Sequence, residues 1–285
     1  MLALDIRNIN KKFPSFELKD ISFQLEKGYI MGFIGVNGAG KTTTIKSILK
    51  LTHIDSGEVH ILGKNMAEHE LELKQEIGFA FGSIDFYTRS KIKTLTDTIK
   101  KFYENWDDQI YSNYMRRFKL DENKKVADLS TGMKVKYSLA LALSHGAKLL
   151  ILDEPTSGLD PASRDDLLDL FQELIAEGEV SILFSTHITS DLEKCADFIT
   201  FIANGQIVLS GEKEEFKEAY LLVNGSKSQL DQVKDRMISY KTNSFGFTGL
   251  IQANDFDPSS GIKAATPSLE DILIYYTKKG ENLHG

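Results

Sequence analysis

The sequence feature that most constrains the fold is a glycine-rich run from Gly35 to Thr42. It fits the pattern G-x-x-x-x-G-K-[ST], in which a loop between a strand and a helix holds the phosphates of ATP or GTP. An apolar run at 29–34 precedes it, and Ile45, Ile48 and Leu49 follow at helical spacing. Glycines let several backbone N–H groups point at one anion, and the start of the helix adds partial positive charge. The run therefore predicts nucleotide binding by an α/β protein.

Side chains in and after this run have expected roles in phosphate chemistry. Lys41 is expected to reach the β- and γ-phosphates, and the Thr42 hydroxyl to hold Mg²⁺. Four apolar residues at 149–152 predict a buried parallel strand that ends at Asp153 and Glu154. Ligands bind at the carboxyl edge of such sheets. We therefore expect Asp153 to hold Mg²⁺ and Glu154 to accept a proton from the attacking water.

A second predicted strand, at 180–184, leads to the same edge and is followed by His187. A lone histidine is more often structural, but the end of this strand aims His187 at the γ-phosphate, so we assign it a functional role. Between the two strands, residues 157–160 form a tight turn that caps a helix from Pro161 onward.

A further helix is predicted to open at 128–134 and to run to about His145. Ser130 is its expected N-cap. A helix start with a small hydroxyl and bare backbone N–H groups is a second candidate anion site, and an ordinary cap is the alternative.

Residues 95–120 have a helical period that predicts a helical subdomain, with Asp107 and Asp108 capping the second of two helices. Its aromatic and apolar side chains are expected to form a core rather than a ligand box. Those predicted to point inward are Ile99, Phe102, Tyr103, Trp106, Ile110, Tyr114 and Phe118.

Composition excludes several classes of protein. Of the 285 residues, 41% are hydrophobic and 26% are charged, and the net charge of −7 gives no electrostatic footprint for nucleic-acid binding. The single cysteine, Cys195, cannot form an internal disulfide and fits a reducing compartment. Residues 1–7 are too short and too charged for a secretory signal, and the most apolar stretch, 139–152, is interrupted by polar residues. We expect a cytoplasmic chain.

The combined motifs resemble the ATP-binding subunit of an ABC transporter over about residues 2–215. The glycine-rich run is similar to Walker A, and 149–154 to Walker B. Residues 129–133 resemble the family's signature sequence, 157–160 its D-loop, and His187 its switch histidine.

The resemblance implies site residues at these positions. Phe13 can stack on an adenine, and although the residue alone favours a core or edge aromatic, it falls where the family has its adenine-stacking aromatic. The resemblance thus implies that ATP is bound by Phe13, Gly35, Val36, Asn37, Gly38, Ala39, Gly40, Lys41, Thr42 and Thr43. It also implies that the ATP of a partner copy is contacted by Leu129, Ser130, Thr131, Gly132 and Met133, and that the D-loop is Ser157, Gly158, Leu159 and Asp160.

The resemblance further implies an ATPase that uses Mg²⁺ and works as a head-to-tail dimer. A second copy or a close homologue and an integral membrane transport subunit are the expected partners, and nucleic acid is not. The chain would then lie on the inner face of the cell membrane through that subunit. Residues 102–107 and 185–190 resemble ABC-2-type exporters of Gram-positive bacteria, which export antibiotics or toxic peptides.

Two departures from the family are visible. Gly82 and Ser83 stand where a Gln usually touches Mg²⁺, and Asp85 is the nearest longer oxygen donor. Thr131 and Met133 replace the usual Gly and Gln of the signature, whereas its serine and second glycine are kept.

The expected organisation is an ABC-type ATP-binding domain at 1–221 and a small α+β appendage at 222–285. The domain would combine a mainly parallel central sheet, an N-terminal antiparallel part and a helical subdomain at about 84–146. The appendage is either a packing extension or a dimerisation or regulatory element. Two other functions stay open: a soluble ABC ATPase of DNA repair or translation, and a nucleotide-dependent regulatory subunit with little turnover.

Overall fold

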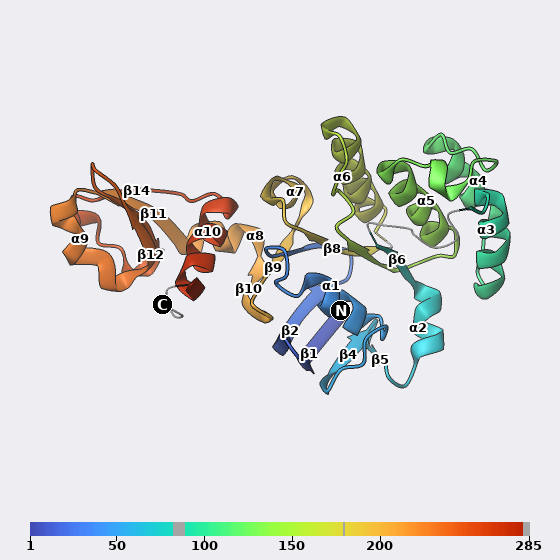
Figure 1. Cartoon of the computed structure of the whole chain (residues 1–285), viewed down its shortest axis with the longest axis horizontal. Coiled ribbons are helices and arrows are strands. Elements are labelled where there is room, and N and C mark those ends of the chain that lie inside the picture. The colour runs from blue at the N-terminus through green and yellow to red at the C-terminus, as the bar shows by residue number, and fades with distance from the viewer. Residues whose placement is uncertain (82–88, 179, 282–285) are drawn as a thin grey trace. The chain divides into compact units, whose positions relative to one another are not determined.

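The computed structural model describes residues 1–81, 89–178 and 180–281 (Figure 1), and the chain divides into two compact units, Met1–Ile207 and Val208–Gly285. The α/β fold expected from the sequence is confirmed. The expected boundary between residues 221 and 222 falls inside a strand of the second unit, whereas the division in the structure precedes Val208.

The N-terminal part of the first unit is an antiparallel sheet with the strand order β2-β1-β4-β5. In β2, apolar side chains alternate with polar ones, and Leu18, Ile21, Phe23 and Leu25 are buried. Such alternation packs one face of a sheet against a core and leaves the other in water. The strands are β1 (Leu2–Lys12), β2 (Glu17–Glu26), β4 (Ser56–Ile61) and β5 (Lys64–Asn65).

The central sheet has the order β10-β9-β3-β8-β7-β6, and its strands from β9 to β6 pair in parallel. Every residue of β3, β7 and β8 is buried, as expected for strands covered on both faces. The strands are β3 (Ile30–Ile34), β6 (Ile77–Phe81), β7 (Leu149–Asp153), β8 (Ser181–Thr186), β9 (Phe198–Ala203) and β10 (Gln206–Glu212).

The register of this sheet brings the three predicted motifs together. Asp153 at the end of β7 is opposite Ser185 of β8, and Thr186 is opposite Ile34 at the end of β3. The glycine-rich run, the acidic pair and His187 therefore leave the sheet at one edge. Helices α1 (Lys41–Ile48), α2 (Glu70–Glu76), α6 (Pro161–Ala176) and α7 (Thr189–Cys195) complete this part of the fold.

Helices α3 (Ile92–Ile99), α4 (Asp108–Arg117) and α5 (Thr131–Ser144) lie together and have their own core (Figure 1). Asp107 caps α4, as predicted, by accepting hydrogen bonds from the backbone N–H groups two and three residues further along the chain. The predicted inward stripe is partly wrong, because Phe102 is 72% exposed and Ile110 is 38% exposed. Tyr111 and Met115 are buried instead, and Tyr111 is the residue immediately after Ile110.

The second unit is an antiparallel sheet of order β12-β13-β11-β14 with helices, which confirms the expected α+β appendage. Its core includes Val223, Val233, Phe247 and Ile251. The strands are β11 (Tyr220–Gly225), β12 (Met237–Thr242), β13 (Phe247–Gln252) and β14 (Lys263–Ala265), and the helices are α8 (Lys213–Ala219), α9 (Lys227–Val233) and α10 (Leu269–Glu281).

Candidate nucleotide-binding and catalytic site

The loop between β3 and α1 has the backbone that its glycines predict. Gly38 and Gly40 have φ angles of 81° and 115°, where an L side chain is strained. At Gly35, a Cβ atom would come within 2.4 Å of the Ile202 carbonyl oxygen. The loop therefore needs glycine for its conformation at two positions and for close packing at the third.

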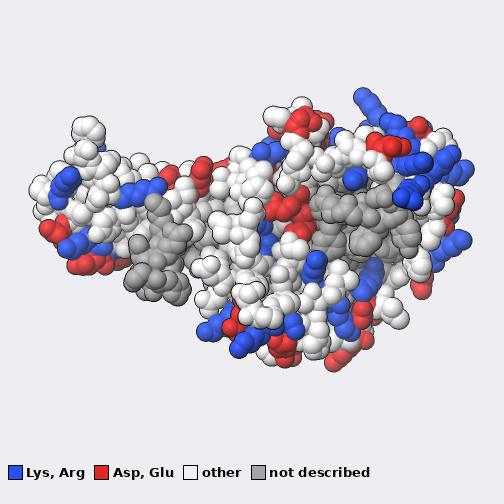
Figure 2. All heavy atoms as spheres, in the orientation of Figure 1, with Lys and Arg blue, Asp and Glu red and all other residues white. Residues whose placement is uncertain are grey.

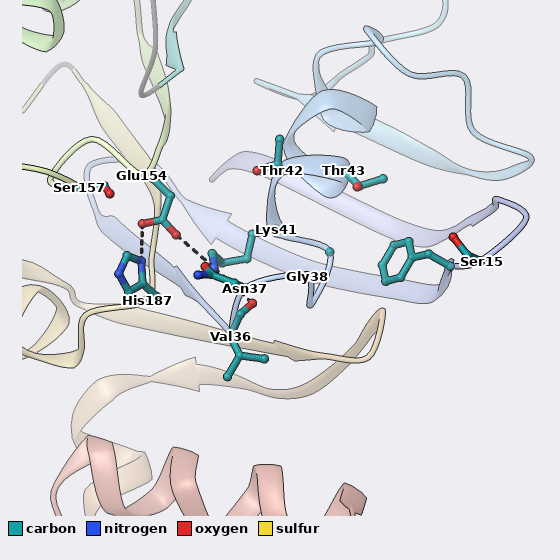
Figure 3. A pocket seen from close by; sticks show the side chains of 12 residues that line it. Ser15, Val36, Asn37, Gly38, Lys41, Thr42, Thr43, Glu154, Ser157 and His187 are labelled. Atoms are coloured by element: carbon teal, nitrogen blue, oxygen red, sulfur yellow. Dashed lines mark hydrogen bonds and ion pairs between the residues drawn. The ribbon is translucent and has the colours of Figure 1, made fainter. Parts of the chain in front are cut away.

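Lys41 opens α1 and points back over this loop (Figure 3). Its side chain is only 6% exposed, and its Nζ donates to the Gly35 carbonyl oxygen at 2.7 Å. The same Nζ lies 3.1 Å from Oε1 of Glu154. The ammonium group is thus held at the centre of the site by partners on two different elements.

Thr42 and Asp153 bring two oxygen donors together. The Thr42 hydroxyl donates to Oδ2 of Asp153 at 2.8 Å, and the Ser185 hydroxyl donates to Oδ1 at 2.6 Å. A hydroxyl and a carboxylate are the hard oxygen ligands that Mg²⁺ takes, and Mg²⁺ is usually bound through only one or two carboxylates. The pair therefore fits the expected metal site, although no group of three or more His, Cys, Asp or Glu residues suited to a metal occurs in the described parts of the chain.

Glu154 has an unusual backbone, with φ at 51°. Its N–H donates to the Ser185 hydroxyl at 2.9 Å, and its Oε2 lies 2.8 Å from Nδ1 of His187. Figure 3 shows the carboxylate between the ammonium of Lys41 and the imidazole ring, each linked to it by a dashed line. A carboxylate thus stands between an ammonium group and an imidazole ring, which is an arrangement that can accept a proton from water.

The side chains of Lys41, Thr42, Glu154 and His187 border a pocket of about 650 Å³. This volume is in the range of small-molecule sites. The pocket is lined by Ser15, Phe16, Val36, Asn37, Gly38, Gly40, Lys41, Thr42, Thr43, Glu154, Ser157 and His187.

Comparison with known proteins agrees with this geometry. Residues 18–157 match the family described as "ABC transporter". The ATP-binding protein YtrB of Bacillus subtilis is 33% identical over 77% of this chain and 75% of its own length. The bacitracin transport ATP-binding protein BcrA of Bacillus licheniformis is 33% identical over 70% of this chain and 67% of its own length.

The chain belongs to the ABC transporter family. A solved structure of an ATP-binding subunit of an ABC transporter, 26% identical, superposes with a TM-score of 0.68 over 75% of this chain and 92% of that one. The protein is therefore an ATP-binding subunit of an ABC transporter and an ATPase. Across the described ranges, the helices are all too short or too polar to cross a membrane.

A second aromatic side chain, Phe16, lies near the position predicted to stack on adenine, and the stacking role of Phe13 stays a prediction. Among the described residues that border the pocket of this ABC subunit, the aromatic one is Phe16, and Phe13 is not included. The two rings lie 6.4 Å apart and are tilted by 33°, and Lys11 Nζ lies 5.6 Å from the centre of the Phe13 ring. An aromatic at this end of the site was predictable, but which of two neighbouring phenylalanines faces the pocket depends on the turn between β1 and β2.

The signature sequence begins α5, and its predicted cap is confirmed. Ser130 is exposed, and its hydroxyl accepts a hydrogen bond from the Met133 N–H at 3.3 Å. Thr131 is exposed as well, and Leu129 is buried. None of residues 129–133 is among the described residues that line the pocket. The structure thus gathers Walker A residues, Glu154 of Walker B and His187 in one pocket, whose described lining does not include the signature.

The D-loop joins the pocket to a helix. Ser157 lines the pocket, and Asp160 is the N-cap of α6, where it accepts from the Ser163 N–H at 3.0 Å. Its hydrogen bonds with Ser163 lower the pKa of Asp160 below its ordinary value. Leu159 faces the signature, because its Cδ2 would lie 3.2 Å from a Cβ atom at Gly132.

Three positions outside the predicted set also shape the site: Phe16, Ser185 and Ser15. Ser185 was detectable, since it immediately precedes Thr186 and His187 at the end of a predicted strand. Gly82, Ser83 and Asp85, at the position of the usual Gln, lie outside the described residues.

Proposed function

We propose that this chain is the ATP-hydrolysing subunit of an export complex, and that two copies, or one copy and a close homologue, close head to tail around ATP. Closure and reopening of the dimer would drive a separate membrane-spanning subunit. The observation that carries this proposal is the one-sided pocket, which has Walker A, Walker B and His187 but no signature residue among its described lining.

The exposed start of α5 supports the shared site. Ser130 and Thr131 are free to contact a ligand on another copy, and the helix N-terminus favours a phosphate. Figure 2 shows Lys and Arg side chains gathered over the helices α3–α5. Positive charge on this part of the surface favours approach to the phosphates held by a second copy. A two-fold arrangement gives each copy the same pair of contacts.

Each catalytic role follows from contacts within the pocket. Lys41 would bind the β- and γ-phosphates, and Thr42 and Asp153 would hold Mg²⁺, which neutralises phosphate charge when it is bound. Glu154 would take the proton of the attacking water. His187, 2.8 Å from that carboxylate, would orient it and contact the γ-phosphate.

Export is supported by the names of two relatives. BcrA is described as a bacitracin transport protein, and a 33% identical relative from Burkholderia lata as a Nod factor export ATP-binding protein. We infer that the cargo of this complex is a peptide or an antibiotic, and that the chain lies on the inner face of the cell membrane through its membrane subunit.

The substitution Glu154→Gln tests the assignment. Loss of the proton acceptor is expected to slow steady-state ATP hydrolysis by roughly 10²–10⁴-fold while ATP affinity is retained, because general bases contribute that much. Uncleaved ATP should then hold the dimer closed, so that gel filtration with ATP shows a species of twice the mass. The exposed Glu26 at the end of β2 offers a matched control, and Glu26→Gln should behave as wild type. Unchanged turnover in Glu154→Gln, with no dimer, would contradict the proposal.

A further inference from the structure

A buried carboxylate outside the pocket connects the elements that carry the catalytic groups. Asp191 lies in the short helix α7, and its side chain is 0% exposed. Its Oδ2 accepts hydrogen bonds from the hydroxyls of Thr156 at 2.7 Å and Thr186 at 3.1 Å. Its Oδ1 accepts one from Nε of Arg164. Three separate segments therefore meet on one side chain.

Two of these segments lead directly to catalytic side chains. Thr186 immediately precedes His187, and its hydroxyl also accepts a hydrogen bond from the Ile188 N–H at 3.0 Å. The residues on both sides of His187 are therefore fixed by hydrogen bonds of the Thr186 hydroxyl. Thr156 is buried and follows Glu154 by two residues. Asp191 thus bridges the segments that carry the proton acceptor and the histidine.

The third segment is the helix that follows the D-loop. Arg164 lies in the first turns of α6, after the N-cap Asp160, and its Nη2 donates to the Ser190 hydroxyl at 2.7 Å. Its guanidinium group therefore donates hydrogen bonds to both Ser190 and Asp191 of α7. The contact between Arg164 and Asp191 therefore links the position of α6 and the preceding D-loop to the position of the loop that carries His187.

A buried charge with these partners has a specific physical consequence. An ionised carboxylate in the interior is stable only when its partners are well placed, and loss of one partner is strongly unfavourable. Displacement of any one of the three segments would therefore strain the contacts of the other two. Apolar packing at this point would allow them to shift independently.

We propose that Asp191 is a positioning residue for ATP hydrolysis, which sets the placement of His187 and Glu154 relative to each other and to the D-loop. This inference rests on the roles proposed above for Glu154 and His187. The two threonines and the arginine that donate hydrogen bonds to the Asp191 side chain are not among the described residues that line the pocket. Asp191 therefore acts on the site through these three partners.

The variant Asp191→Asn removes the charge and keeps the shape. We expect kcat for ATP hydrolysis by the full-length chain to fall about 10–100-fold, since a misplacement of about 1 Å can cost that much. ATP affinity, measured by equilibrium binding, should stay within about twofold of wild type, because the Walker A contacts are unchanged. A matched control is Asp5→Asn, because Asp5 is also a buried carboxylate paired with an arginine, Arg7, but lies in β1. The control should keep wild-type kcat.

A double-variant cycle separates positioning from a general loss of structure. If Asp191 acts partly through His187, Asp191→Asn should lower kcat by a clearly larger factor in the wild-type background than in the His187→Ala background, where only the placement of Glu154 is left to disturb. Full multiplication of the two effects, unchanged kcat in Asp191→Asn, or parallel loss of ATP binding and kcat would each overturn the inference.

The variant Thr186→Val decides the matter if Asp191→Asn does not fold. It keeps the volume of the side chain and removes only its hydrogen bonds, so it should lower kcat and be non-additive with His187→Ala in the same way. Wild-type kcat in Thr186→Val would also overturn the inference. Wild-type turnover in Glu154→Gln or His187→Ala alone would instead count against the proposed catalytic roles, and thus the two failures can be told apart.

Discussion

The Ser185 hydroxyl is shared between the two acidic residues of the site. It donates to Asp153 and accepts from the N–H of Glu154, and the serine is fully buried. A non-glycine residue with φ above zero costs on the order of 1–3 kcal/mol and persists only when its surroundings hold it in place. At Glu154 this hydrogen bond helps to do so. One hydroxyl thus orients the candidate metal ligand and holds the strained backbone of the candidate base.

Two single-residue variants can show whether Phe16 or Phe13 stacks on the adenine. Base–aromatic stacking contributes about 1–3 kcal/mol per base, so Phe16→Ala is expected to weaken ATP binding roughly 5–160-fold. Binding of inorganic tripolyphosphate, which lacks a base, should be unchanged. The matched variant Phe13→Ala should alter ATP affinity by less than about twofold, because Phe13 is not among the described lining residues. Fluorescence titration of each variant measures this, and the reverse ranking would identify Phe13 as the stacking residue.

At the scale of elements, α5 is fixed at both ends by side-chain contacts. Ser130 caps its start, and at its end His145 stacks on Tyr103, with ring centres 3.8 Å apart and planes 9° from parallel. The His145 Nδ1–H donates to the Gln75 carbonyl oxygen at 3.0 Å, just before the end of α2. The helix that carries the signature is thereby attached to α2, next to the central sheet.

The burial of His145 at this contact predicts that the stability of the protein depends on pH. Burial lowers the pKa of His145 below its ordinary value of 6.5. The folded state therefore favours the neutral ring, and below about pH 6.5 the unfolded state binds more protons than the folded one. The contribution to stability is complete above pH 6.5 and is lost as the pH falls towards the lower folded pKa. Urea unfolding at pH 7.5 and 5.5 should show a smaller pH effect in His145→Gln than in wild type. The exposed His53 provides the control, and an equal pH effect in His145→Gln and His53→Gln would refute the prediction.

Helices and strands with a clear apolar pattern were predicted correctly from the sequence, whereas the orientation of individual side chains was predicted less well. The run at 149–152 can only be a buried strand beside a phosphate-binding loop, and β7 is that strand. In α4, by contrast, the apolar residues Ile110 and Tyr111 are adjacent, and the sequence alone does not show which of the two side chains points into the core. Packing against α5 selects Tyr111, whose hydroxyl is paired with that of Thr96 at 2.9 Å. Phe13 and Phe16 present the same ambiguity within a turn, and only tertiary contacts resolve it.

At the scale of the whole molecule, the pocket and the signature are separate features of one chain. If each ATP needs Lys41 of one copy and Ser130 of another, two different inactive variants should complement each other. Lys41→Ala removes the ammonium group proposed to bind phosphate, and Ser130→Glu places a negative charge where the partner's γ-phosphate would lie. A glutamate near a helix N-terminus is compatible with the helix, so α5 should still form.

Each variant alone should be almost inactive, because both of its sites are defective. When the two are mixed in equal amounts and allowed to exchange, about half of randomly formed dimers pair unlike copies, and two-fold symmetry leaves one intact site in each. Steady-state ATP hydrolysis of the mixture is then expected to recover to about a quarter of the wild-type rate. Mixing Lys41→Ala with the double variant Lys41→Ala/Ser130→Glu provides no intact lysine and should stay inactive. If the first mixture hydrolyses ATP no faster than the average of its two components, although mass spectrometry shows that mixed dimers have formed, Lys41 and Ser130 do not serve a common ATP across the interface, and the head-to-tail arrangement must be abandoned.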